Sequence, residues 1–170
     1  MFSINKYSNN SNNNDNRNNN SLTKEINIYI DGACKGNPGP AGIGYIIIDK
    51  NNGRPISAYA APIGQSTNNK AEYTSLIYAL EDLIEIIKKQ QKIRKNNHHI
   101  QPYQYQLYIF TDSQLIFGHL QNNWNVGNEL IKYYHRTKNL LKKFDKWTII
   151  KIKRELNEAA DTLASIGCLL

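Results

Sequence analysis

Cysteine, methionine and tryptophan are scarce in this 170-residue chain, which contains two, one and two of them respectively. Cys34 and Cys168 show no metal-type spacing, so neither a disulfide framework nor a zinc site is indicated. No segment approaches the roughly 18 to 20 apolar residues of a membrane span, and the N-terminus lacks the apolar core of a secretory signal. We therefore expect an intracellular protein, of the cytoplasm or nucleus, with no membrane partner.

Acidic residues are also in short supply, with 14 Asp and Glu against 21 Lys and Arg, which gives a formal net charge of +7. The basic excess is concentrated from Lys132 to Arg154, with a second cluster from Lys88 to Lys95. A basic balance of this kind favours a polyanionic partner such as nucleic acid. The alternative is that these lysines form solvated helix faces that serve only solubility.

The chain divides into a tail and one domain. Residues 1–22 are dominated by Asn and Ser and have almost nothing to bury, which predicts a disordered Asn-rich tail. Residues 24–170 carry the apolar patterning, and a chain of this length has room for a single core.

The predicted order of elements is βββαβααβα, an α/β class in which a five-stranded mixed sheet has helices on both faces. Turn chemistry between the first two strands comes from CKGNPGPAG, and Thr67 or Asn68 can cap the first helix. Strands are expected over 26–31, 43–49, 55–64, 105–112 and 147–154, and helices over 68–95, 113–121, 129–144 and 157–170.

Four acids lie where they should be costly, at the ends of apolar strands or near the starts of helices: Asp31, Glu72, Asp112 and Asp161. Buried carboxylates are tolerable only if they are paired, protonated or holding cations. Clustered hard oxygen ligands suit Mg²⁺ or Mn²⁺ best. If the first and fourth strands are adjacent and parallel, Asp31 and Asp112 converge, and the two helical acids can reach the same point.

These acids lie in four motifs that resemble, in order and spacing, those of type 1 ribonuclease H. The motifs are DGACKGNPGP, TNNKAEY, TDSQ and RELNEAADTLA, within a resemblance that runs from Asn27 to Leu170. The segment around Trp124 is similar to the short members of this family, the reverse-transcriptase-like and archaeal ones, which lack a basic protrusion. The resemblance implies a ribonuclease H-like fold and a monomeric endoribonuclease that cuts the RNA strand of RNA/DNA hybrids.

The same resemblance implies a site with two Mg²⁺ ions, or Mn²⁺ in their place, and products with 5′-phosphate and 3′-hydroxyl ends. Asp31 would bridge both ions, and Asp161 would serve the ion that activates the attacking water. Glu72 and Asp112 would hold the ion beside the leaving 3′ oxygen. By family resemblance the substrate contacts are Gly32, Cys34, Asn37, Thr67, Asn68, Asn69 and Gln114.

The chain departs from many family members in one respect. Lys151 stands where they carry a mobile histidine, so Arg154 or Glu155 of the RE pair is the candidate to assist. Trp124 is expected either to line a channel for the DNA strand or to plug the core beneath its loop. His98, His99, His119 and His135 are expected to be solvent-exposed or packing residues.

Two other functions stay open at this point. The first is a binding module that grips hybrid or double-stranded RNA without cleaving it. The second is another nuclease of the same superfold that acts on duplex RNA or duplex DNA.

Overall fold

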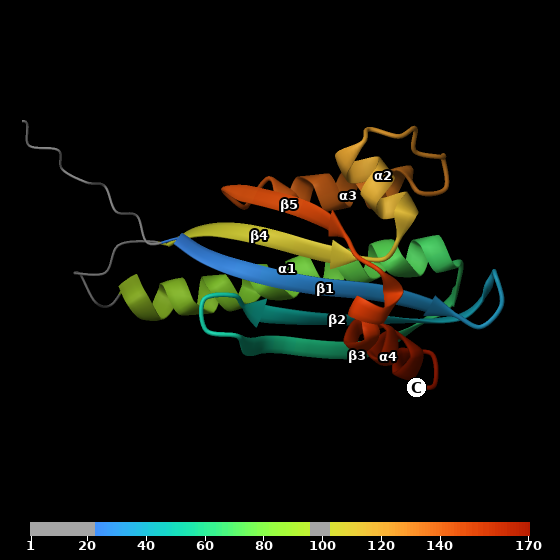
Figure 1. The fold of residues 1–170 in the computed structure, drawn as a ribbon, viewed down its shortest axis with the longest axis horizontal. Coiled ribbons are helices and arrows are strands. Elements are labelled where there is room, and N and C mark those ends of the chain that lie inside the picture. Colours follow the sequence, from blue (N-terminus) through green and yellow to red (C-terminus); the bar gives the residue numbers. More distant parts are fainter. Residues whose placement is uncertain (1–22, 96–102) are drawn as a thin grey trace, which may run out of the picture.

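The structure, a computed structural model, describes residues 23–95 and 103–170, and its strands form one five-stranded sheet (Figure 1). The predicted tail and the loop with His98 and His99 lie outside the described residues. The strands are β1 (Thr23–Cys34), β2 (Gly39–Asp49), β3 (Arg54–Ser66), β4 (Gln104–Thr111) and β5 (Lys146–Lys151), in the order β3-β2-β1-β4-β5. The first three pair antiparallel, whereas β4 lies parallel to β1 and β5 parallel to β4.

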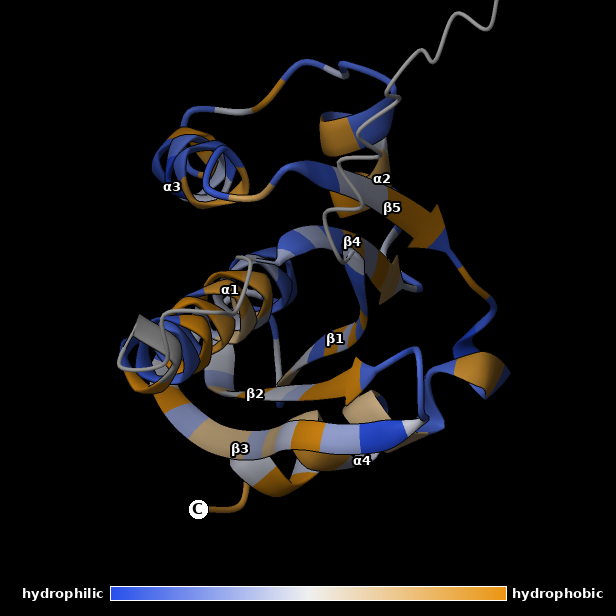
Figure 2. Ribbon diagram, turned by 90° about the vertical axis from the view of Figure 1, so that its left-hand side faces the viewer, coloured by the Kyte–Doolittle hydropathy of each residue, from blue (hydrophilic) through white to orange (hydrophobic). Residues whose placement is uncertain are grey.

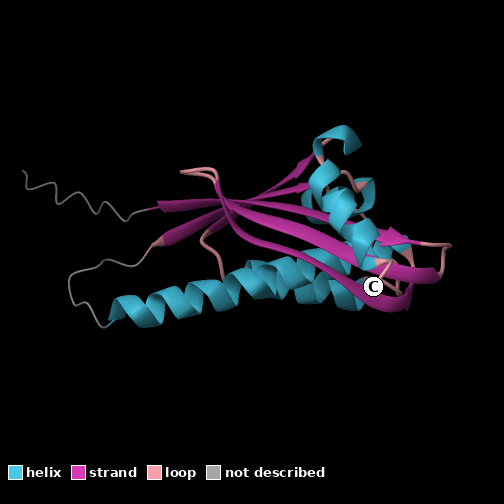
Figure 3. Ribbon diagram, turned by 90° about the horizontal axis from the view of Figure 1, so that it is seen from below, coloured by secondary structure: helices cyan, strands magenta, loops and turns pink. Residues whose placement is uncertain are grey.

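Helices cover both faces of this sheet, as the views from the side and from below show (Figures 2 and 3). They are α1 (Asn68–Lys95), α2 (Gln114–Gln121), α3 (Ile131–Leu141) and α4 (Glu158–Gly167), with a short 3-10 turn over Arg154–Leu156. The long helix α1 packs on β1 and β2 and carries α3 beside it, whereas α4 packs across β1, β2 and β3. This arrangement confirms the predicted class and element order. Within the described residues, no helix is both long and apolar enough to cross a lipid bilayer.

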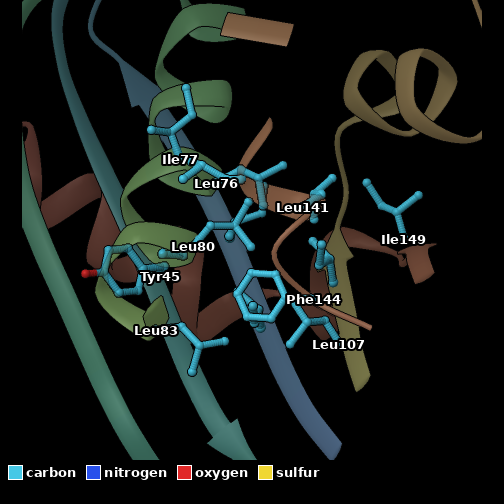
Figure 4. Close-up of a cluster of buried hydrophobic side chains, with 14 of the residues drawn as sticks. Tyr45, Leu76, Ile77, Leu80, Leu83, Leu107, Leu141, Phe144 and Ile149 are labelled. Atoms are coloured by element: carbon cyan, nitrogen blue, oxygen red, sulfur yellow. The ribbon is translucent and has the colours of Figure 1, made fainter. Parts of the chain in front are cut away.

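The main core lies between the sheet and α1 (Figure 4). Alternate residues of β1, Ile26, Ile28 and Ile30, point into it and are at most 1% exposed, as the two-residue period of a strand requires. Leu76 and Leu80 of α1 meet them from the helix side and are fully buried. Each such side chain contributes about 1.5–3 kcal/mol through its removal from water, so the strand and helix patterns predicted from sequence fix how α1 sits on the sheet.

The β1–β2 hairpin is tighter than the sequence predicted. β1 continues to Cys34 and β2 begins at Gly39, so the turn shrinks from nine residues, 34–42, to Lys35–Pro38. The ladder holds to its end, with Cys34 opposite Ala41. Gly36 takes a φ of 90° in this turn, a left-handed conformation that favours glycine, and the Asn37–Pro38 peptide bond is cis.

Two element boundaries at the C-terminal end also differ from prediction. The helix predicted over 129–144 is shorter, Ile131–Leu141, although Phe144 beyond it is still buried. The strand predicted over 147–154 ends at Lys151, because the last ladder partner on β4 is Thr111 and the chain then enters the 3-10 turn. The hydrophobic period identifies the apolar residues of a strand or helix. It does not show where a strand loses its pairing partner.

Candidate active site

Asp31 and Asp112 come together because β1 and β4 are neighbouring parallel strands. Tyr29 lies opposite Phe110 in their ladder, so the residues two positions further along each strand, Asp31 and Asp112, share one end and one face of the sheet. Asp31 lies inside β1 and is 8% exposed, whereas Asp112 follows the last residue of β4 and is half-buried. The predicted convergence of the two strand acids is therefore present.

Glu72 reaches this point from α1, which lies unusually close to β1. A Cβ atom on Gly32 would lie 2.3 Å from the main-chain N of Glu72, so only glycine permits this approach. The Glu72 carboxylate is 8% exposed and accepts hydrogen bonds from Ser113 Oγ at 2.6 Å and from Asn68 Nδ2 at 3.1 Å. These two bonds, from the starts of α2 and α1, fix the orientation of the Glu72 carboxylate.

Asp161 approaches from the opposite face on α4. That helix packs against Gly44 of β2, where an added Cβ would lie 2.4 Å from the Ala160 carbonyl oxygen. The Asp161 side chain is 29% exposed, more than expected for a core acid, and it accepts a hydrogen bond from the Arg154 guanidinium. That bond raises the pKa of Arg154, and the charges of Asp31 and Asp112 add to the effect. Arg154 thus neutralises part of the acid cluster.

The acids act on one another electrostatically. Burial raises the pKa of Asp31 to about 7, and the charge of Asp112, followed by those of Asp161 and Glu72, adds to the shift against a hydrogen bond from the Gly32 backbone. The pKa of Glu72 is also raised to about 7, first by burial and further by Asp112, while Ser113 and Asn68 oppose the rise. Full ionisation of all four acids is therefore unfavourable near neutral pH unless a positive charge is present.

This donor set fits divalent cations of the hard type. Carboxylate oxygens are the ligands that Mg²⁺ and Mn²⁺ prefer, and a cation would offset both the burial and the mutual repulsion that raise the pKa values of Asp31 and Glu72. The Oδ1 atom of Asn157 adds a buried oxygen that has no hydrogen-bond partner. Over residues 23–95 and 103–170, no three His, Cys, Asp or Glu side chains are arranged to hold one metal ion together, so the case for a cation site rests on the chemistry of the donors and on the electrostatic coupling of Asp31 to the other three acids.

Two residues of the site carried no predicted role. Asn157 donates through Nδ2 to Asp112 Oδ1 at 3.1 Å and to the Ile30 carbonyl at 3.0 Å, which ties the start of α4 to β1 and β4. Ser113 binds Glu72 and also caps α2 by accepting from the Ile116 amide. Ser113 lies in the TDSQ motif next to Asp112, and Asn157 lies in the RELNEAADTLA motif one helical turn before Asp161, and that placement was the available signal.

The predicted substrate contacts gather beside the acids, at the β1–β2 turn and the starts of α1 and α2. Asn37 accepts a hydrogen bond from the Asn68 amide at 3.2 Å, which joins the turn to α1. Thr67 is the cap of α1, accepting from the Lys70 amide at 3.4 Å, so the cap is Thr67 and not Asn68. Gln114 is exposed at the start of α2, and Asn69 is half-buried in the first turn of α1.

Cys34 and Gly32 differ from the other predicted contacts. The Cys34 thiol is directed at main chain, donating to the Ser66 carbonyl at 3.1 Å and the Gly39 carbonyl at 3.5 Å. Gly32 is buried within β1, and its lack of a side chain serves the packing of α1. For Gly32, which family resemblance gives as a substrate contact, the structure shows a packing reason for the glycine. A substrate role for either residue stays a prediction.

The remaining residues singled out from sequence lie around this site. Trp124 is 46% exposed and rests its ring on Gly118, so it is not a fully buried plug. His119 is 5% exposed, with Nδ1 2.8 Å from the Tyr73 hydroxyl, which is a packing role as predicted. Lys151 is the last residue of β5, and Glu155 is exposed within the 3-10 turn.

The strand order of this sheet and the acids at one end of its central strands define a class of protein. Comparison with known families identifies that class. The RNase H family model matches residues 23–168. The chain therefore belongs to the RNase H family, in its type 1 branch.

Individual relatives support this family assignment. The chain is 33% identical to ribonuclease HI of Halobacterium salinarum over 141 residues, which is 82% of this chain and 62% of that protein. The crystal structure of RNase H1 from Halobacterium salinarum NRC-1 matches with a TM-score of 0.70 at 32% identity, covering 84% of this chain and 96% of that one. LC11-RNase H1, solved in complex with an RNA/DNA hybrid, matches with a TM-score of 0.66 at 32% identity, covering 84% and 96%.

Proposed function

We propose that this protein is an endoribonuclease that hydrolyses the RNA strand of RNA/DNA hybrids. The observation that carries the proposal is the meeting of four carboxylates, from β1, α1, the end of β4 and α4, in a chain of the RNase H family. A structural relative solved with an RNA/DNA hybrid supports the substrate class. The net charge of +7 suits a polyanionic substrate.

The chemistry we propose is two-metal phosphodiester hydrolysis. Two bound divalent ions would lower the pKa of a water molecule and neutralise charge on an in-line displacement, giving 5′-phosphate and 3′-hydroxyl products. The charges of all three other acids act on Asp31, which is the candidate to hold both ions, while Asp161 would serve one ion and Glu72 and Asp112 the other. Asn157, Ser113 and Asn68 keep these carboxylates oriented through the hydrogen bonds described above.

Arg154 is the candidate auxiliary residue in this proposal. It forms an ion pair with Asp161, and the charges of Asp31 and Asp112 also raise its pKa. A guanidinium on a rotatable stem can pass from a carboxylate to a phosphate, since both present a pair of oxygens to its planar fork of N–H donors. Glu155, beside it, is exposed and has no hydrogen bond among the described residues.

Recognition of the hybrid is proposed for the turn and helix starts beside the acids. RNA is distinguished from DNA by its 2′-hydroxyl groups in a wide, shallow minor groove, which small polar side chains and main-chain amides can reach. Asn37, Asn68, Asn69 and Gln114 present such groups on one rim of the site. Thr67, at the positive end of α1, is the candidate to meet a DNA phosphate.

The proposal is tested with a substrate panel. RNA/DNA hybrid, duplex RNA and duplex DNA of one sequence are incubated with the purified full chain in Mg²⁺, in Mn²⁺ and in EDTA. We expect cleavage of the hybrid alone, within its RNA strand, with either metal and not with EDTA. Binding of the hybrid without cleavage at millimolar Mn²⁺ would identify a binding module instead, and equal cleavage of duplex RNA or DNA would identify a nuclease of different specificity.

A further inference from the structure

A cavity of about 460 Å³ opens directly beside Asp112. Its lining consists of Asp112 and five consecutive residues where β5 ends and the 3-10 turn begins: Lys151, Ile152, Lys153, Arg154 and Glu155. Three of these six residues are cationic. One of the three, Lys151, stands at the position where many family members carry a mobile histidine.

The backbone that carries these lysines is fixed relative to the acids. Thr111 and Lys151 are the last paired residues of β4 and β5, and the Ile152 amide then donates to the Thr111 carbonyl at 2.9 Å. Thr111 is the residue before Asp112. At the other end, the Leu156 amide donates to the Lys153 carbonyl at 2.9 Å, which closes the 3-10 turn. Lys151 and Lys153 are thus held beside Asp112 by main-chain hydrogen bonds.

The two lysines have charges that the protein leaves uncompensated. Both are exposed, and within the described ranges neither lies within ion-pair distance of a carboxylate. Arg154 differs, because its guanidinium is bound to Asp161. Two unpaired ammonium groups on an anchored main chain, in a cavity next to the acid cluster, have the chemistry of an anion subsite.

We propose that Lys151 and Lys153 bind the RNA-strand phosphate adjacent to the scissile one. The inference rests on the proposed function, because the scissile phosphate must lie over the acids for this cavity to receive its neighbour. Since the cavity shares Asp112 with the acid cluster, the next phosphate of the same strand is the nearest anion available to it. Such contacts fix the register of the strand without reading its sequence.

The first test measures binding without cleavage. The Lys151→Gln/Lys153→Gln variant is compared with wild type for binding a fluorescent 16-base-pair hybrid in EDTA from 50 to 200 mM salt. Loss of one phosphate contact reduces the steepness of log K against log salt by about 0.9, so wild type should lose about three- to fourfold more affinity over this range than the variant. The matched control is Lys142→Gln/Lys146→Gln, which removes the same charge from exposed sites remote from the cavity.

If the control variant lowers the salt slope as much as the cavity variant does, the effect is one of general charge and the proposal is overturned. The assay contains no metal, so its outcome does not depend on whether the protein cleaves hybrids. Absence of cleavage by wild type would refute the proposed function. If wild type cleaves hybrids but the cavity variant binds them with the same salt slope as wild type, only this inference is refuted.

The second test identifies the phosphate. Single neutral methylphosphonates are introduced at successive positions of the RNA strand and, separately, of the DNA strand. Wild type should lose affinity at the RNA position next to the cleavage site, and the cavity variant should be insensitive to that same substitution. Equal loss in both proteins, or coupling to a DNA-strand position, would contradict the assignment.

Discussion

The side-chain amide of Asn157 joins two elements that the sequence keeps far apart, donating from one nitrogen to Asp112 Oδ1 at 3.1 Å and to the Ile30 carbonyl at 3.0 Å. Asn157 is 2% exposed and immediately precedes α4. It therefore sets the position of α4, and with it Asp161, against the ends of β1 and β4. The spacing of three of the four acids depends on this residue.

Asn157→Ala is expected to impair both stability and activity. Loss of the amide leaves the buried Ile30 carbonyl unpaired and costs about 1–3 kcal/mol in the free energy of unfolding, measured by urea denaturation. Loss of orientation at Asp112 should lower kcat on a hybrid by about 10- to 100-fold. Asn125→Ala, at an exposed position, is the control and should change neither quantity. Full activity of Asn157→Ala would show that Asp112 is oriented by other contacts.

Asp112→Asn should abolish hybrid cleavage while the fold persists. The amide oxygen can still accept from Asn157, but a neutral group is a poor ligand for a divalent ion, so activity should fall by more than about 100-fold. Because the charge of Asp112 raises the pKa of Asp31 and Glu72, the variant should melt no lower than wild type in EDTA. Glu158→Gln, an exposed acid on α4, is the control and should retain cleavage.

The stability of the metal-free protein should fall as pH rises. Asp and Glu in an unfolded chain titrate near pH 4, whereas the pKa values of Asp31 and Glu72 are about 7 in the folded protein. The folded state therefore binds protons more tightly between these values, and the free energy of unfolding decreases from about pH 4 to about pH 7. Urea midpoints in EDTA at pH 5 and pH 8 measure this decrease.

Two comparisons isolate the acids in that experiment. The pKa of His119 is lowered by burial, which acts in the opposite direction, so the wild-type curve is read against Asp31→Asn, whose pH dependence should be flatter. Mg²⁺ should raise the midpoint more at pH 8 than at pH 5, since ionised carboxylates bind it. A midpoint that rises equally at both pH values, or not at all, would argue against a cation site at the acids.

Gly32→Ala is expected to be severely destabilising although alanine is a small residue. Its Cβ would lie 2.3 Å from main-chain atoms of Ala71 and Glu72, so α1 must move away from β1. Overpacking of this kind costs about 1–3 kcal/mol, and hybrid cleavage should fall as well because Glu72 moves with the helix. Gly127→Ala is the matched control, with no atom within 4 Å of the added methyl group. Equal melting temperatures of the two variants would refute this account.

Much of this fold is readable from local patterns. The apolar residues from Ile26 to Ile30 and the helical spacing of Leu76 and Leu80 were sufficient to predict a strand and a helix there, and these isoleucines and leucines are buried in the core. The convergence of Asp31 and Asp112 was also predictable, because it needs only adjacent parallel strands. Those features depend on the hydrophobic period and on the sign of charge of each residue, which can be read directly from the sequence.

Other features depend on distances that no local pattern contains. Nothing in the sequence shows that Gly32 makes room for α1, since a glycine in that motif is equally compatible with a turn. The bond of Asn157 to Asp112 and the free position of Lys153 beside the cavity depend on where β5 stops pairing. Even the greater exposure of Asp161 follows from how α4 lies against Gly44.

The parallel pairing of β1 with β4 affects the order in which the protein folds. An antiparallel hairpin such as β1–β2 can form from neighbouring residues, whereas β4 joins β1 only after the whole of α1 has been made and laid across the sheet. Recovered cleavage after dilution from denaturant should therefore trail the return of helical circular dichroism, and the catalytic signal would report the final docking event of refolding.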